Sequence, residues 1–275
     1  MNHALKALQL KAKEQVHTLL SGHSLSRLQG EGYDFSELRE YQIGDDIRKI
    51  NWMISAKLGK PYIKTLHSNR ELSVAVATFM DASFYFAYNH AKQKKLTEVA
   101  TLLGYATLQQ NDLFRGFCFT QAQTYHTPPT KQHYHLETFS QTLYEIPLLH
   151  TTLERKTALA TLFQALTTPS LLFIVSDFLE AVDLSLLAQK HEVIAIIIRD
   201  EAEESPQILG EVTLQSPHNA DKKRTYFGKK TQEKYLHQLQ QHDAKQKEHF
   251  AQHHIRHVKI LTKDDVVKKL MTLFT

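Results

Sequence analysis

The chain has 275 residues, of which 42% are hydrophobic and 23% are charged. This length and balance are typical of one large globular domain, with or without a smaller appendage, and they exclude wholesale disorder. The formal net charge of +4 is a weak bias, so we expect no nucleic-acid partner. The single cysteine, Cys118, excludes an intramolecular disulfide and a zinc site built from cysteines.

The N-terminus lacks the continuous apolar core of a signal peptide. No stretch approaches the ~18 apolar residues that are needed to span a bilayer. We therefore expect a soluble, cytoplasmic protein without a membrane anchor.

The first predicted elements surround a segment rich in charge. Apolar residues recur at helical spacing over residues 4–20, which predicts an amphipathic helix. The segment GEGYDFSELREYQIGDDIRKINW follows at residues 30–52, and a strand is predicted over 62–66. We expect residues 1–70 to hold this N-terminal helix and a charged, β-rich extension.

From residue 71 onward, apolar runs alternate with helical patterns. The apolar runs suit strands that are buried on both faces, and they cover residues 72–80, 113–119, 170–176 and 192–198. The helical patterns between them cover residues 95–110, 135–146, 157–166 and 184–190. This alternation predicts an open α/β fold whose mostly parallel sheet carries helices on both faces. The basic run around Lys92 is interpreted as the exposed start of a helix.

The C-terminal part has a different pattern before it returns to a strand and a helix. Short polar-alternating strands over 210–228 predict a hairpin, and residues 231–254 predict a long polar helix. A last strand over 257–261 and a closing helix over 264–274 follow. We expect residues 71–275 to form one domain, with the hairpin and the long helix inserted before its last strand.

Acidic residues follow three of the predicted strands. Asp81, Asp177 and Asp200 each come after an apolar run, and Ser83 and Thr157 add hydroxyl groups. Ligands of open parallel sheets bind outside the carboxyl ends of the strands, and carboxylate and hydroxyl oxygens are the ligands that Mg²⁺ prefers. The alternative interpretation is that these residues are helix caps and turn residues.

The sequence resembles a known family in residues 30–64 and in the stretch ELSVAVATFMDAS at 71–83. The residues that follow the family signature in order are Phe35, Arg39, Glu40, Tyr41, Gly44, Asp45, Arg48, Ile50, Trp52 and Ala56. They resemble the bacterial domain-of-unknown-function 58 family and, more widely, the von Willebrand factor A fold. Weaker similarity extends over nearly everything after the first helix. The chain departs from the pattern at Asn51, where the family usually has an aspartate.

The resemblance implies a metal-ion-dependent adhesion site of the form Asp-x-Ser-x-Ser, completed by a distant threonine and aspartate. Asp81, Ser83, Thr157 and Asp177 match this pattern, whereas Tyr85 stands at the position of the second serine. The implied site is therefore an incomplete Mg²⁺ site. A metal-free scaffold that keeps the fold is the alternative.

The resemblance also implies a function. It indicates a non-enzymatic interaction module that works with MoxR-type AAA+ ATPases and docks a partner at the strand-end face. A bound metal would there hold a coordination position open for a carboxylate of the partner. The alternative is a metal-dependent phosphoester hydrolase with Asp81, Asp177 and Asp200 around Mg²⁺.

The charged segment itself is interpreted as architecture or a docking surface. Buried charges need hydrogen-bonded partners of opposite sign, and arginine–carboxylate pairs meet that need. We expect a polar network that pins the segment onto the domain, and it comprises Arg39, Glu40, Asp45, Asp46, Arg48 and Trp52.

Overall fold

The computed structural model divides the chain into two compact units, and each is considered by itself. The described residues are 3–21, 37–42, 45, 47, 50, 52–65, 72–86, 88–121 and 124–273. The larger unit holds the first helix and everything from residue 72 onward, and the smaller unit lies between them in the chain. None of the helices described is long and apolar enough to cross a membrane.

The first helix, α1 (His3–Ser21), belongs to the larger unit rather than with the charged segment that follows it in the chain. Its apolar stripe, Leu5, Ala12, Val16 and Leu19, is buried. The helix packs on α4 (Ala91–Gln109), where Lys11 also forms an ion pair of 2.5 Å with Glu98. Amphipathic periodicity thus gives the helix correctly, whereas its position in the chain does not tell which unit it joins.

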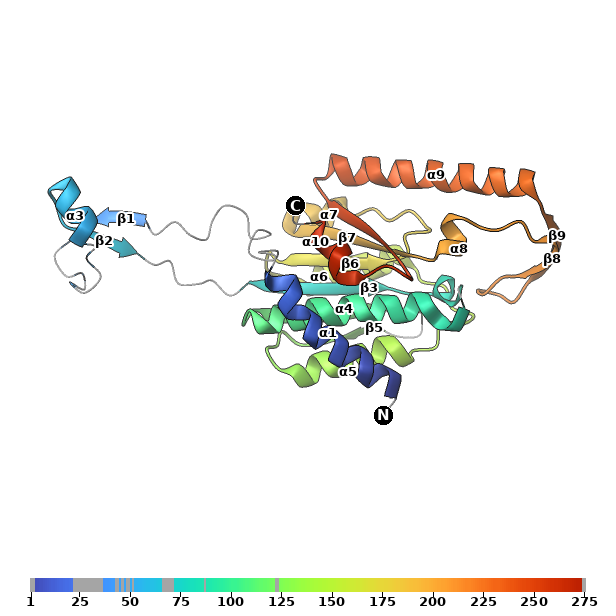
Figure 1. Ribbon diagram of the computed structural model, residues 1–275, viewed down its shortest axis with the longest axis horizontal. Coiled ribbons are helices and arrows are strands. Elements are labelled where there is room, and N and C mark those ends of the chain that lie inside the picture. The colour runs from blue at the N-terminus through green and yellow to red at the C-terminus, as the bar shows by residue number, and fades with distance from the viewer. Residues whose placement is uncertain are drawn as a thin grey trace. The chain divides into compact units, whose positions relative to one another are not determined.

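A six-stranded sheet forms the centre of the larger unit, as Figure 1 shows. Its strand order is β10-β7-β6-β3-β4-β5, and every neighbouring pair is parallel except β4 and β5 at one edge. The predicted open, mostly parallel sheet is confirmed. The strands are β3 (Ser73–Phe79), β4 (Leu113–Phe119), β5 (Thr124–His126), β6 (Leu171–Ser176), β7 (Glu192–Arg199) and β10 (Arg256–Leu261).

Helices cover both faces of this sheet, which explains why its inner strands are apolar on both sides. Helix α4 and α5 (His133–Glu145) pack on one face (Figure 1). On the other face, α6 (Arg155–Ala165) and α7 (Ser185–Lys190) contribute to a core with side chains of the sheet. Every residue of β6 is buried.

Strands β3 and β6 lie side by side at the centre, and the chain leaves them in opposite directions. From β3 it continues to β4 on one side, and from β6 to β7 on the other. This is a topological switch point, where loops diverge at the carboxyl ends of two neighbouring strands and leave room for a ligand or partner.

An insertion separates β7 from β10. It comprises α8 (Glu201–Glu204), the hairpin of β8 (Gly210–Gln215) and β9 (Lys222–Phe227), and the long helix α9 (Lys229–Gln252). The predicted hairpin is present as a two-stranded sheet of its own. The chain then ends, after β10, in helix α10 (Val266–Met271).

The smaller unit consists of β1 (Glu37–Glu40), α3 (Trp52–Leu58) and β2 (Tyr62–Thr65), with the two strands antiparallel. Glu40 pairs with Lys60 at 2.8 Å, but both side chains are more than half exposed. Trp52 is 65% exposed, and Asp45 accepts a hydrogen bond from the nearby Gln42 amide at 2.9 Å. Glu40 and Trp52 are thus exposed within the smaller unit, and the network that pins the segment onto the larger unit stays a prediction.

Three other expected members of this network fall on parts of the chain that the structure does not describe. Asp46 and Arg48 lie outside the described residues, as does the side chain of Arg39. A role of the segment in docking stays a prediction.

The fold makes a prediction about pH through His191, which is buried just before β7. Neither ring nitrogen has a hydrogen-bond partner among the described residues. Burial, helped by the nearby Lys190 charge, lowers the pKa of His191 below its usual value. The folded protein therefore binds this proton less readily than the unfolded chain, and stability falls as the pH drops through about 6.5.

We expect His191→Gln, which cannot titrate in this range, to weaken the pH dependence of the melting temperature between about pH 7.5 and 5.5. His254→Gln is the matched control, since His254 is exposed. An unchanged pH profile in His191→Gln would contradict this interpretation.

Candidate functional site

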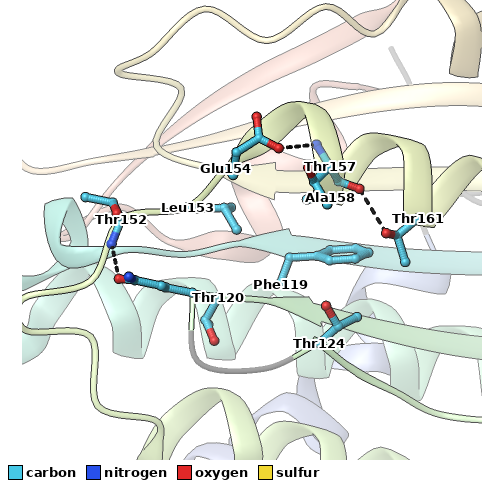
Figure 2. A pocket seen from close by; sticks show the side chains of 10 residues that line it. Phe119, Thr120, Thr124, Thr152, Leu153, Glu154, Thr157, Ala158 and Thr161 are labelled. Carbon is cyan, nitrogen blue, oxygen red and sulfur yellow. Dashed lines mark hydrogen bonds between the residues drawn. The ribbon is translucent and has the colours of Figure 1, made fainter.

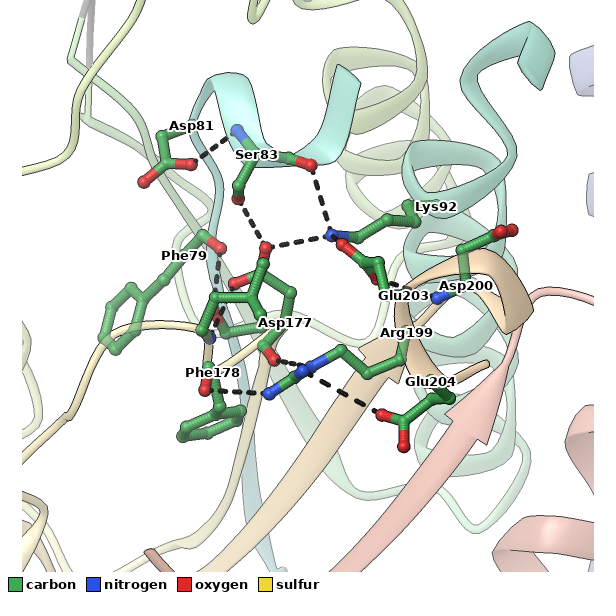
Figure 3. Close-up of polar contacts among 12 residues, drawn as sticks. Phe79, Asp81, Ser83, Lys92, Asp177, Phe178, Arg199, Asp200, Glu203 and Glu204 are labelled. Atoms are coloured by element: carbon green, nitrogen blue, oxygen red, sulfur yellow. Dashed lines mark hydrogen bonds and ion pairs between the residues drawn. The ribbon is translucent and has the colours of Figure 1, made fainter. Parts of the chain in front are cut away.

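Three of the four residues predicted as metal ligands meet at the switch point (Figure 3). Asp81 follows β3 and caps the short helix η2 (Ala82–Tyr85), because its Oδ1 accepts a hydrogen bond from the Ser83 amide at 2.9 Å. The Ser83 hydroxyl donates in turn to Oδ2 of Asp177, which directly follows β6. The parallel pairing of β3 and β6 brings the two loops together.

A lysine that we expected on the surface lies at the centre of this site. Lys92, in the first turn of α4, is fully buried. Its ammonium group donates to the Ser83 carbonyl at 3.1 Å, to Asp177 Oδ2 at 3.0 Å and to Glu203 Oε1 at 2.8 Å (Figure 3). The ring of Phe84 lies 5.1 Å from the same nitrogen. The interpretation of this basic run as an exposed helix start is therefore wrong for Lys92.

The two carboxylates around Lys92 differ in their electrostatics. Burial alone disfavours the charge of Asp177, but the attraction of Lys92 and hydrogen bonds from Ser83, Lys92 and the Leu179 amide outweigh it and lower the pKa. For Glu203, burial prevails over the attraction of Lys92 and raises the pKa. The Lys92 ammonium group thus lies between a carboxylate whose charged form is stabilised and one whose charge is disfavoured by burial.

A second buried cation donates hydrogen bonds to the backbone of the loop after β6. Arg199, the last residue of β7, is fully buried and donates from Nε to the Asp177 carbonyl at 2.5 Å and from Nη2 to the Phe178 carbonyl at 3.1 Å (Figure 3). Phe178 has a φ of 48°, a left-handed conformation that is uncommon for a bulky residue. The guanidinium group thus stabilises a strained loop at the residue next to Asp177.

Asp81 has a cation of its own. Arg155, at the start of α6, donates from Nη2 to Asp81 Oδ2 at 3.0 Å and also pairs with Glu180. The Arg155 side chain is nine-tenths buried, whereas that of Glu180 is 65% exposed. With Ser83 bound to the other oxygen, both carboxylate oxygens of Asp81 are engaged.

Thr157, the fourth predicted ligand, is used elsewhere. Its amide donates to Glu154 Oε2 at 2.6 Å, so that Glu154 caps helix α6. Thr157 lines a separate pocket of about 520 Å³ with Phe119, Thr124 and Thr161 (Figure 2). None of the described hydrogen bonds joins it to Asp81, Ser83 or Asp177.

Asp200 and Tyr85 also have local roles. Asp200 caps α8 in a reciprocal arrangement with Glu203 and accepts a hydrogen bond of 2.6 Å from Thr262, as the capping alternative predicts. Tyr85 is partly exposed, and its ring packs edge-to-face on that of His90 at 4.9 Å.

The residues present do not fit a Mg²⁺ ion. Such an ion needs near-octahedral oxygen ligands at 2.0–2.1 Å, whereas the oxygens of Asp81 and Asp177 already accept from Arg155, Lys92 and Ser83. An ammonium group beside Asp177 would also repel a dication. Over the described ranges, no group of three or more His, Cys, Asp or Glu side chains is arranged to hold a metal. The arrangement favours the metal-free alternative.

Sequence reasoning missed Lys92, Arg155, Arg199 and Glu203. Two of them carried a signal in the sequence. Lys92 is four residues before Leu96 and seven before Val99, so it lies on the buried face of its helix. Arg199 ends a strand that is otherwise buried and apolar, where a charge requires a partner. Arg155 and Glu203 gave no comparable signal.

Comparison with known proteins agrees with the sequence signature. The family described as "Protein of unknown function DUF58" matches residues 37–246. The chain belongs to this family. It is 26% identical over 221 residues to uncharacterized proteins of Mycobacterium bovis and Mycobacterium tuberculosis, which covers 77% of this chain and 69% of theirs.

Among solved structures, the chain is similar to the conserved hypothetical protein BatB from Bacteroides thetaiotaomicron, with 10% identity and a TM-score of 0.42. The match covers 74% of this chain and 96% of that one. This similarity is too distant to support a functional assignment.

The ion cluster makes a prediction about stability. Asp177→Asn removes one of the two carboxylates that pair with Lys92 while preserving the shape of the side chain. Because the buried cation then loses part of its counter-charge, we expect a cost of about 3–5 kcal/mol in the free energy of unfolding, measured by urea denaturation. Glu180→Gln is the control, and for this exposed residue we expect a change below about 0.5 kcal/mol. Equal effects of the two variants would contradict the prediction.

Proposed function

We propose that this chain is a non-enzymatic interaction module that docks a MoxR-type AAA+ ATPase at the carboxyl-end edge of its sheet. One observation carries the proposal. Asp81, Lys92, Asp177 and Glu203 are buried and paired with one another or with Arg155, whereas Tyr85 and Phe86 beside them are exposed. Such an edge suits binding better than chemistry.

The hydrolase alternative gains no support from the geometry. A general base or a nucleophile needs a group that is free to accept a proton or attack a substrate. Asp81 and Asp177 are held by Arg155, Lys92 and Ser83. The Cys118 thiol is buried, and burial raises its pKa to about 12, so it is not an activated nucleophile.

The proposed docking surface lies on the loop after β3. Tyr85 is 42% and Phe86 45% exposed. Tyr85 also lines a groove of about 410 Å³ together with Tyr144, Pro147 and Leu149. Exposed aromatic side chains are enriched at binding hot spots, where they provide a large contact area with few rotatable bonds. The ion cluster beneath supplies a rigid base for this loop.

The identity of the partner rests on the family resemblance, which implies an A-domain protein that works beside a MoxR-type ATPase. Docking through a shared Mg²⁺ ion is not part of the proposal, because Lys92 and Arg155 already neutralise the carboxylates that would bind it. The aromatic loop supplies the contact instead.

The docking surface is tested by measuring the affinity for the MoxR-type ATPase of the same genome. We expect the double variant Tyr85→Ser, Phe86→Ser to weaken binding by about tenfold or more, as loss of hot-spot residues does. Tyr134→Ser is the matched control, since Tyr134 is 70% exposed and follows β5, which runs back toward the opposite edge. If the wild-type chain forms no complex with the ATPase, the partner assignment is wrong. If both variants lose the same amount of affinity, the assignment of the docking surface to Tyr85 and Phe86 is wrong.

The smaller unit offers a second contact. Trp52 and Met53 are both well exposed on α3, and Trp52 belongs to the family signature. If this residue serves docking, Trp52→Ser should weaken ATPase binding and leave the melting temperature of the chain unchanged. A fall in melting temperature with unchanged affinity would instead assign Trp52 to the architecture.

A further inference from the structure

The bonds made by Lys92 resemble those of a bound cation. An ammonium group has three hydrogens to donate, and it finds three acceptors: the Ser83 carbonyl, the Asp177 carboxylate and the Glu203 carboxylate. These acceptors follow three adjacent strands, β3, β6 and β7. The cation therefore links three loops at the switch point, as a metal ion in this position would.

The difference from a metal ion is that this cation is covalently attached. Its side chain comes from α4 and is fully buried, so that it neither exchanges with solvent nor leaves a coordination position open. The charge balance also differs. A single positive charge faces Asp177 and Glu203, and Asp81 is neutralised separately by Arg155.

We propose that Lys92 is a tethered cation that takes the structural place of a divalent ion and makes this strand-end site independent of metal. The assignment rests on the contacts of Lys92 alone, so it holds whether or not the chain binds an ATPase. It adds one consequence that does rest on the proposed function: chelators should leave docking unaffected.

The same geometry implies that removal of the side chain opens a cation site. Lys92→Ala leaves two carboxylates and a carbonyl oxygen around the vacated volume, which are the hard oxygen ligands that Mg²⁺ and Mn²⁺ prefer. Lys92→Met fills the same volume with an uncharged thioether that a hard cation does not favour. The two variants therefore separate loss of the charge from creation of the site.

The experiment measures the melting temperature of the wild-type chain, Lys92→Ala and Lys92→Met in EDTA and in millimolar MgCl₂ or MnCl₂. A ligand that binds only the folded state must raise the melting temperature. We expect no shift for the wild type, lower melting temperatures for both variants, and a metal-dependent rise of at least ~2 °C in Lys92→Ala alone.

Lys95→Ala is the matched control. Lys95 is also a largely buried lysine of α4, but it donates to the Asp264 carbonyl and pairs with Glu98, and none of its described contacts is with Ser83, Asp177 or Glu203. Its variant should not respond to metal. Electron paramagnetic resonance of added Mn²⁺ gives a second readout, in which only Lys92→Ala should bind the ion.

Two results would overturn the proposal. One is stabilisation of the wild type by Mg²⁺ that Asp177→Asn abolishes, since the site would then hold a metal beside Lys92. The other is a folded Lys92→Ala that neither binds Mn²⁺ nor gains stability from it. Should Lys92→Ala not fold in EDTA, recovery of folding in MnCl₂ counts for the proposal, and failure to recover counts against it.

Discussion

The buried ammonium group of Lys92 donates hydrogen bonds to three acceptors that follow the ends of strands. The arrangement of the loops at the carboxyl-end edge of the sheet depends on these bonds. Without Lys92, Asp177 and Glu203 would face each other in a site from which water is excluded. A buried charge is stable only when it is paired and hydrogen-bonded, and here each of the three N–H groups of the ammonium has an acceptor. The conformation of the loops after β3, β6 and β7 is thereby linked.

A second set of charges extends this link to the insertion. Arg199 reaches the Asp177 and Phe178 carbonyls on one side and Asp243 of α9 at 3.3 Å on the other. Asp243 also accepts from Lys259 of β10 at 2.6 Å. The long helix, polar along most of its length, is therefore joined to the site by partly buried ionic contacts as well as by Phe250 in the apolar core. Nη1 of Arg199 has no hydrogen-bond partner among the described residues, but the other contacts of the network restrict the movement of the loop after β6.

This rigidity is relevant to binding. Interfaces gain affinity when the contacting side chains are held in place before the partner arrives, because less conformational freedom is lost. Tyr85 and Phe86 follow directly on Ser83 and Phe84, which contact Lys92. In the proposed docking mode, the ion cluster holds the loop in place while the exposed Tyr85 and Phe86 contact the partner. This mode differs from an adhesion site whose open metal position captures a partner's carboxylate.

The sequence by itself determined the fold class and part of the site. Continuous apolar runs, alternating with helical periodicity, specify a parallel sheet between two layers of helices, since such strands are stable only when both faces are buried. The acidic residues after these runs correctly pointed to the switch point, where Asp81, Ser83 and Asp177 meet. The signature of residues 30–64 gave the family.

Only the tertiary structure decided which groups surround those carboxylates. Lys92 is 85 residues from Asp177 and 111 from Glu203 in the chain, so no local pattern relates them. Thr157 matched a spacing but lies in another pocket, because a motif gives the order of residues and not the direction of their side chains. A cation site is defined by atoms that converge from several loops, and that convergence is a property of the folded chain alone.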